Sequence, residues 1–251
     1  MRGNLKRRRV LLLKAGEVSA AVRRSQGDYD RWFAEALQDA PIDWTVVEAQ
    51  AGQPLPQNAS AFDALVITGS PLSLTEREPW MLRAADYVRE TADKGLPVLG
   101  VCFGHQLLGC AYGSEVIRNP LGREIGSVEV SLTESGERDP LFAGVPKNLV
   151  VQATHEDIVA KIPAGATILA GNANTANQAM AIGPNARGVQ FHPELRPDAL
   201  SALVRSRAAT IELEAARRGA PPAEAIPAIV NGIRPAPFAR KLLLNFIERF
   251  A

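Results

Sequence analysis

Cysteine and histidine are scarce in this sequence of 251 residues, which has two cysteines, Cys102 and Cys110, and three histidines. Two cysteines in one short segment cannot build the disulfide framework of a small secreted protein, and neither stands in a pair with zinc-ligand spacing. We therefore expect no metal site, no structural disulfide and a reducing compartment.

Neither sign of charge dominates the chain. There are 28 Lys and Arg residues against 27 Asp and Glu residues, a formal net charge of +1. Proteins that bind nucleic acid or acidic membranes through general electrostatics usually carry a clear excess of basic residues. We predict neither kind of partner.

Long apolar runs are also absent. The basic start, MRGNLKRRR, resembles the opening of a secretory signal, but the apolar run that follows, residues 10–13, is cut short by Lys14. No stretch approaches the roughly 20 apolar residues of a membrane span. We interpret the start as a solvated basic tail leading into a buried strand, and we expect a cytoplasmic protein.

Short apolar runs that alternate with helix-like segments are the main pattern that is present. Runs such as ALVITGS and LPVLGVC are nearly continuous in hydrophobicity, which favours strands buried on both faces of a parallel sheet. Helices are predicted near residues 29–39, 79–94, 104–112 and 197–218. The alternation predicts an α/β fold with an open, mostly parallel central sheet flanked by helices.

The second half of the chain differs in pattern. Residues 115–183 contain strand-like runs without intervening helices, which predicts an antiparallel or mixed edge on the same sheet. Residues 218–237 are rich in Pro and Ala and are interpreted as an ordered connection or a lid-like excursion, and residues 238–251 as a C-terminal amphipathic helix. We predict a single domain over residues 1–251, with its core at about 9–217.

One of the two cysteines stands where a strand is expected to turn into a helix. Cys102 lies in the run Gly100-Val101-Cys102-Phe103-Gly104, the thiol form of a nucleophile elbow. The flanking glycines remove Cβ atoms that would collide in a cramped turn, and the start of the helix favours a thiolate. The N–H of Phe103 is then placed to hold an oxyanion. Cys110, inside the expected helix, is interpreted as a buried small apolar residue.

A cysteine nucleophile needs a base and a group that orients the base. His192 ends an apolar run and is followed by Pro193 and Glu194, so the carboxylate lies close enough to bond the imidazole. Cys102, His192 and Glu194 therefore provide a nucleophile, a base and a group that orients the base. We expect them to lie close together, because the carboxyl ends of parallel strands gather at one edge of the sheet. His155 is an alternative that could line the site, and His105 is expected to point away from it.

These runs resemble a known family. GVCFGHQLL and GVQFHPE, with VITGSPLSL, NPLGREIG, DPLFAGVP and THEDIV in the same order, are similar to class I glutamine amidotransferases, and most of all to stand-alone proteins like the amidotransferase domain of GMP synthase. The resemblance implies a flavodoxin-like architecture and a Cys-His-Glu triad of Cys102, His192 and Glu194. It also implies hydrolysis of the glutamine side-chain amide through a γ-glutamyl thioester.

The resemblance further implies the residues around the triad. Ser70 would supply a second oxyanion N–H opposite Phe103. The substrate-binding residues that it implies are Gly69, Pro71, Gln106, Asn119, Gly122 and Arg123.

The sequence leaves three functions open. It contains no pyrophosphate-binding or Gly-x-x-x-x-Gly-Lys-Ser/Thr loop, so we predict no cofactor and expect any ATP-dependent acceptor activation to occur on a separate synthetase partner. The chain would then release ammonia and glutamate from glutamine for that partner. Alternatively, it would be a free-standing hydrolase of γ-glutamyl peptides or amides, or a non-catalytic regulatory module with the same fold.

Overall fold

The computed structural model describes residues 7–251, so most of the predicted basic tail lies outside the described residues. Nine strands form one sheet in the order β2-β1-β3-β4-β11-β10-β9-β6-β7, and β5 pairs with β8 in a separate sheet. The strands are β1 (Arg8–Lys14), β2 (Ile42–Glu48), β3 (Ala64–Ile67), β4 (Val98–Val101), β5 (Val116–Arg118), β6 (Glu124–Leu132), β7 (Asn148–His155), β8 (Asp157–Val159), β9 (Ala166–Gly171), β10 (Ala179–Ile182) and β11 (Ala186–Val189).

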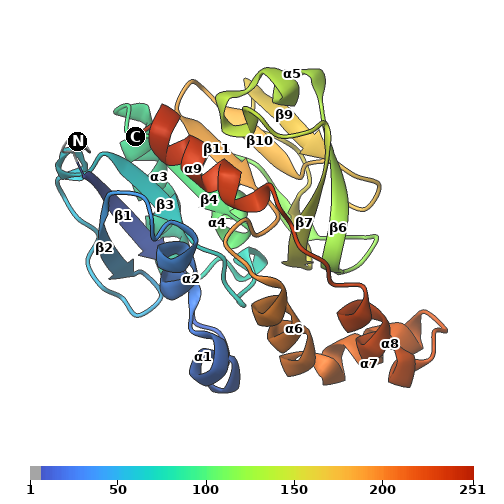
Figure 1. Cartoon of the computed structure of the whole chain (residues 1–251). Coiled ribbons are helices and arrows are strands. Elements are labelled where there is room, and N and C mark those ends of the chain that lie inside the picture. Colours follow the sequence, from blue (N-terminus) through green and yellow to red (C-terminus); the bar gives the residue numbers. More distant parts are fainter. Residues whose placement is uncertain (1–6) are drawn as a thin grey trace.

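Helices cover both faces of the sheet and gather at one of its ends (Figure 1). The α-helices are α1 (Ala20–Gln26), α2 (Tyr29–Ala36), α3 (Pro79–Asp93), α4 (Phe103–Ala111), α5 (Glu134–Arg138), α6 (Pro197–Ser206), α7 (Ala208–Arg217), α8 (Pro222–Asn231) and α9 (Ala239–Arg249). Among the described residues, no helix is both long enough and apolar enough to cross a membrane.

The parallel half of the sheet runs from β2 to β11. Its inner strands are buried on both faces, whereas the edge strand β2 is partly exposed. In β1, Val10 and Leu12 join the core cluster that α2 and α9 cover, whereas Leu11 and Leu13 join the cluster under α3 and α4. All four side chains are almost completely buried. Alternation between two apolar layers explains why the run is continuously hydrophobic in the sequence.

The other half of the sheet confirms the predicted antiparallel edge. From β11 onward, each of the strands β10, β9, β6 and β7 pairs antiparallel with its neighbour. The prediction was wrong for β5, which pairs with β8 outside the main sheet. It was also wrong in expecting no helix there, because Thr133 caps the short helix α5 by accepting a hydrogen bond from Gly136.

The helix predicted over residues 197–218 is two helices. The chain leaves helical geometry at Arg207, where φ is −108° and ψ is 15°. Leu200 and Leu203 of α6 and Ile211 of α7 are buried in one cluster with side chains of α1 and α8. Separate packing of the two halves explains the break, since the sequence there contains no Gly or Pro.

The Pro/Ala-rich segment of residues 218–237 is ordered and contains a helix. α8 begins at Pro222, a residue suited to the first turn, and continues through Pro227. Figure 1 shows α6, α7 and α8 grouped at one end of the molecule. The start of α7 lines the cavity beside Cys102.

Candidate active site

Cys102 occupies the corner between β4 and α4 in a backbone conformation that side chains rarely adopt. Its φ is 53° and its ψ is −104°, and among the described residues only Arg77 is another non-glycine residue with positive φ. Its N–H donates to the carbonyl of Val189 on β11 at 2.8 Å. Backbone strain of this kind is held in place by the surrounding structure and concentrates at functional sites.

The glycines that flank Cys102 are required by close backbone contacts. A Cβ on Gly100 would collide with the carbonyl oxygen of Gly104, and a Cβ on Gly104 would lie 2.5 Å from that of Ile67. Neither position can accept a side chain without a backbone shift. The sequence spacing therefore reflects the tight approach of α4 to β3 and β4.

His192 and Glu194 form a buried pair just beyond the end of β11. The Nδ1 of His192 lies 2.6 Å from Oε1 of Glu194, and both side chains are at most 1% exposed. Burial alone would lower the pKa of His192, but the negative charges of Glu194 and Cys102 outweigh burial and raise it to about 10. A His192 that is protonated near neutral pH can donate a proton.

Gly69 shows that His192 and Cys102 lie on the same side of the molecule. A Cβ built on Gly69 would be 2.7 Å from Cε1 of His192 and 3.6 Å from Cβ of Cys102. The same position would be 3.2 Å from Cε1 of Tyr29, a buried side chain for which the sequence predicts only a place on a helix. The loop after β3 can approach Cys102 and the imidazole of His192 because Gly69 has no side chain.

A cavity of about 280 Å³ opens beside Cys102. It is lined by residues from the loop after β3, the start of α4, the β5 and β7–β8 segments and the start of α7. The lining residues are Ser70, Pro71, Leu72, Ser73, Glu76, Cys102, Phe103, Gln106, Arg118, Arg123, Thr154, His155, Glu156, Asp157, Arg207 and Thr210.

The two predicted oxyanion residues both lie in the wall of this cavity. Phe103 is the first residue of α4, where a backbone N–H has no partner within its own helix. Ser70 follows Gly69, and its Oγ accepts the N–H of Leu72 at 3.1 Å, which fixes the loop. The use of the two backbone N–H groups as oxyanion donors stays a prediction.

The predicted substrate-binding residues other than Gly69, which is not in the cavity lining, fall into two groups. Gln106 and Arg123 line the cavity together with Pro71. The side-chain amide of Gln106 donates to the carbonyl of Asp157 at 2.8 Å, which turns its N–H₂ group away from free solvent. Substrate binding by these residues is not tested by the geometry and stays a prediction.

Asn119 and Gly122 are not among the residues that line the cavity. The Asn119 side chain donates to Asn174 at 2.8 Å and accepts the N–H of Leu121 at 2.9 Å. A Cβ on Gly122, where φ is +84°, would collide with the guanidinium of Arg218. Both residues support the loop that carries Arg123.

His155 lines the cavity but is engaged by a carboxylate of its own. Its Nε2 lies 2.9 Å from Oε2 of Glu124, and Glu124 also accepts from Gln178 at 2.5 Å and from Asn172 at 2.6 Å. Burial raises the pKa of Glu124, and these donors together hold it below its usual value. The network fixes the β6–β7 wall.

Arg207 and Thr210 are cavity residues that sequence reasoning missed. Both lay inside the single helix predicted for residues 197–218, where an Arg is typical of a solvated face. No sequence signal marks the helix break that places Arg207 in the cavity wall, because the break depends on packing against distant helices.

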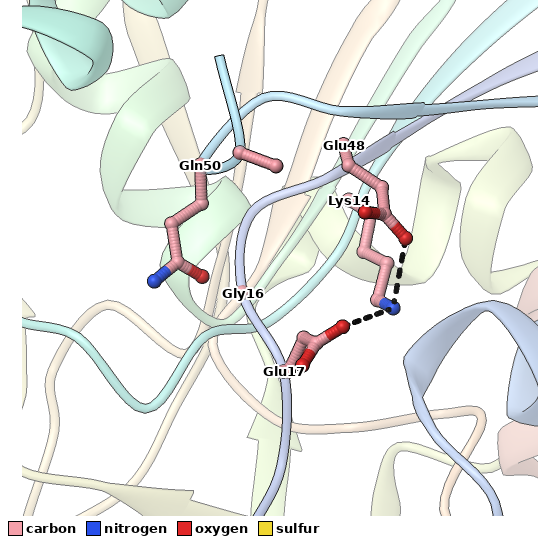
Figure 2. Close-up of a pocket in the computed structure, with 6 residues that line it drawn as sticks. Lys14, Gly16, Glu17, Glu48 and Gln50 are labelled. Atoms are coloured by element: carbon pink, nitrogen blue, oxygen red, sulfur yellow. Dashed lines mark hydrogen bonds and ion pairs between the residues drawn. The ribbon is translucent and has the colours of Figure 1, made fainter. Parts of the chain in front are cut away.

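A second cavity, of about 320 Å³, lies at the carboxyl ends of β1 and β2, and its lining residues include no cysteine, serine or threonine. Figure 2 shows Lys14 reaching toward Glu17 and Glu48, which lie 3.6 Å and 3.5 Å from its Nζ. Asp28 is closer, at 3.0 Å. Burial opposes protonation of Lys14, but the carboxylates around it raise its pKa. The positive charge of Lys14 is therefore compensated by carboxylates of the same chain.

The part of the chain from 7 to 251 contains no cluster of three or more His, Cys, Asp or Glu side chains that could hold a metal ion. The Cys102 site consists of a thiol, an imidazole–carboxylate pair and backbone N–H groups. These are the components of nucleophilic acyl transfer.

Three similarities to known proteins bear on this site. Residues 25–206 match the family model "Glutamine amidotransferase class-I". The chain is 28% identical to gamma-glutamyl peptidase 4 of Arabidopsis thaliana over 77% of this chain and 78% of that protein. It is 35% identical to a subunit of the glutamine-hydrolysing GMP synthase of Saccharolobus solfataricus over 54% of this chain and 69% of that protein.

A solved structure agrees in fold. A glutamine amidotransferase from Thermotoga maritima superposes with a TM-score of 0.70 at 22% identity, covering 98% of each chain. The family model spans most of the chain, including Cys102, His192 and Glu194. This protein therefore belongs to the class I glutamine amidotransferase family.

Proposed function

We propose that this protein hydrolyses the side-chain amide of glutamine, releasing ammonia and glutamate through a γ-glutamyl thioester on Cys102. The observation that carries the proposal is the strained Cys102 corner lying beside the buried His192–Glu194 pair. A thiolate, a protonated imidazole and an orienting carboxylate are what amide cleavage by a cysteine nucleophile requires.

The first half of the reaction forms the thioester. The sulfur of Cys102 attacks the amide carbon, and the N–H groups of Phe103 and Ser70 hold the resulting oxyanion. His192 gives its proton to the departing nitrogen, the carbon–nitrogen bond breaks, and ammonia leaves. Glu194 keeps Nδ1 of His192 protonated and the ring oriented, because its Oε1 accepts a hydrogen bond from Nδ1–H at 2.6 Å.

The second half restores the enzyme. His192, now neutral at Nε2, takes a proton from water, and the hydroxide attacks the thioester carbon. The carbon–sulfur bond breaks and the thiolate of Cys102 is regenerated with a protonated His192. The new carboxyl group loses its proton to solvent, and glutamate leaves. Similarity to a GMP synthase subunit favours a chain that supplies ammonia to a separate ATP-dependent synthetase.

A second candidate function is hydrolysis of γ-glutamyl peptides or other γ-glutamyl amides. It uses the same thioester, and only the departing amine differs. Similarity to gamma-glutamyl peptidase 4 over 77% of the chain favours it. Comparing the turnover of glutamine alone with that of γ-glutamyl dipeptides separates the two, because rapid dipeptide cleavage beside negligible glutamine hydrolysis rejects the ammonia-supplying role.

Labelling with a glutamine-derived electrophile, followed by mapping of the modified residue, tests the common chemistry. We expect the label on Cys102, and we expect Cys102→Ala to abolish turnover in a folded protein. Cys110→Ala is the matched control, because the Cys110 thiol lies on α4 at a partly buried position outside the cavity lining. A label on Cys110, or turnover retained by Cys102→Ala, would falsify the assignment.

The choice of histidine has its own test. His192→Gln is expected to reduce kcat far more than His155→Gln, because His192 lies against Cys102 and His155 is paired with Glu124. A larger kcat loss for His155→Gln would assign proton transfer to the other imidazole.

A further inference from the structure

One wall of the Cys102 cavity comes from beyond the part of the chain that the family model describes. The match to that model ends at residue 206, and the cavity lining includes the next residue, Arg207, and Thr210 on α7. Ile211 of α7 and Ile226 of α8 are buried in the cluster that also holds α6, so this wall is a packed part of the fold.

The other two arginines of the cavity are neutralised by carboxylates. Arg118 lies 2.7 Å from Glu156. Arg123 lies 2.9 Å from Glu156 and 3.0 Å from Glu214 of α7. Their positive charges are used to hold the cavity wall together.

Arg207 differs from both. Its guanidinium donates to the hydroxyl Oγ1 of Thr154, and within the described part of the chain it makes no ion pair with a carboxylate. A guanidinium that lines a cavity and has no carboxylate partner is available to bind an incoming anion. The fork of N–H donors on Arg matches a carboxylate in two hydrogen bonds.

The position of Arg207 brings this charge close to the triad. Thr154 lies on β7 two residues after Gln152, whose carbonyl accepts the N–H of His192 at 2.8 Å. Burial raises the pKa of Tyr29, and the nearby charge of Arg207 opposes that shift. Tyr29 and His192 both lie within 3.2 Å of a Cβ built on Gly69, and Arg207 and Cys102 line the same cavity.

We propose that Arg207 binds a carboxylate of the substrate and makes turnover depend on that carboxylate. This inference rests on the proposed function. The carboxylate has two possible sources: the α-carboxylate of the γ-glutamyl group, which glutamine also carries, or the carboxylate of a departing amino acid in a γ-glutamyl dipeptide.

Three substrates of nearly equal size separate these sources. γ-Glutamylglycine carries both carboxylates, γ-glutamylglycinamide carries only the α-carboxylate, and the α-amide of γ-glutamylglycine carries only the carboxylate of the departing glycine. Each is assayed with the wild-type protein and with Arg207→Gln, Arg207→Lys and Arg205→Gln. Arg205 is the matched control, because it is an exposed Arg two residues away and outside the cavity lining.

Arg207→Gln is expected to raise KM about 10- to 100-fold, the range for loss of a charged hydrogen bond, for the substrates that carry the bound carboxylate. The substrate that lacks this carboxylate should change by less than about threefold. Arg207→Lys should recover part of the loss because it keeps the positive charge, and Arg205→Gln should match wild type. Loss confined to the substrates with the α-carboxylate, or to those with the carboxylate of the departing glycine, supports the proposal and identifies which carboxylate Arg207 binds.

An equal loss on all three substrates, or no recovery with Arg207→Lys, overturns the proposal and leaves Arg207 a structural residue. Failure of the Arg207 proposal is separated from failure of the proposed function by a binding measurement. The same compounds are bound, by calorimetry, to Cys102→Ala and to the double variant that also carries Arg207→Gln. Charge-dependent binding without wild-type hydrolysis rejects the hydrolase alone. Hydrolysis without carboxylate dependence rejects the role of Arg207 alone, and absence of both binding and hydrolysis rejects both.

Discussion

At the residue scale, the protonation of His192 is decided by a balance between burial and charge. Burial favours the neutral ring, whereas Glu194 at 2.6 Å and the nearby Cys102 favour the cation. The charged neighbours prevail and place the pKa at about 10. The site is thus expected to hold its proton on His192 across the neutral range.

Glu194→Gln tests this balance. Removing the carboxylate removes the main charge that keeps the imidazole protonated, so the alkaline limb of kcat/KM should move to lower pH by about 1–3 pH units. Profiles between about pH 6 and pH 11 for the wild type and the variant measure the shift. An unchanged limb would mean that His192 is not the titrating group.

The same balance links pH to stability. The pKa of His192 rises on folding from its ordinary value of 6.5 to about 10, so its contribution favours the folded state. That stabilisation is complete below about pH 6.5 and is lost as the pH rises through about 10. Urea unfolding of His192→Gln against wild type at several pH values should show a difference that shrinks toward alkaline pH.

Gly69→Ala is predicted to damage catalysis more than stability. The added methyl group would meet Cε1 of His192 at 2.7 Å and displace the ring from Cys102. A displacement of about 1 Å can cost roughly 100-fold in kcat. Gly232→Ala is the control, since Gly232 is in helical geometry and its nearest neighbours lie 3.3 Å and 3.4 Å from the added atom. Equal kcat values in the two variants would contradict the crowding argument.

At the element scale, α7 positions its part of the cavity wall through a single well-buried side chain. Ile211 is 5% exposed, whereas Leu213 on the same helix is 52% exposed. Ile211→Ala should cost about 2–4 kcal/mol of unfolding free energy and raise KM, because Arg207 and Glu214 flank it. Leu213→Ala should change neither by much. Denaturant unfolding and steady-state kinetics on both variants measure the effects, and a loss of kcat alone would contradict the positioning role.

Elements that depend on local pattern were predicted well. The buried strands β1, β3 and β4, the elbow at Cys102 and the antiparallel edge all follow from runs of apolar residues and glycine placement. The break at Arg207 and the separate β5–β8 sheet could not be predicted in this way. Both depend on which distant segments pack against them, such as Thr154 against Arg207, and a single sequence does not show that pairing.

At the scale of the whole molecule, a buried ion pair ties three distant regions together. Arg187 on β11 lies 2.9 Å from Asp139, which precedes the turn carrying Leu141, and its guanidinium also stacks over Phe250 at the end of α9. Both charged side chains are only 7% exposed. Removing one partner would leave the other charge buried and uncompensated.

Asp139→Ala is therefore expected to cost about 3–5 kcal/mol and to lower Tm clearly. kcat measured well below Tm should remain near wild type, because Cys102 and His192 do not contact this pair. Thermal denaturation followed by circular dichroism gives the stability, and assays at low temperature give the activity. A variant with unchanged Tm would show that solvent reaches the pair.

The hydrogen bond from Cys102 to Val189 has a consequence for the newly made polypeptide. Cys102 and His192 follow two strands that are neighbours in the sheet, β4 and β11, but are synthesised far apart in time. A nascent chain would carry the cysteine long before its histidine leaves the ribosome. A growing chain would therefore carry Cys102 without the carbonyl of Val189 that its N–H bonds, and without His192, until β11 and the residues after it have been made.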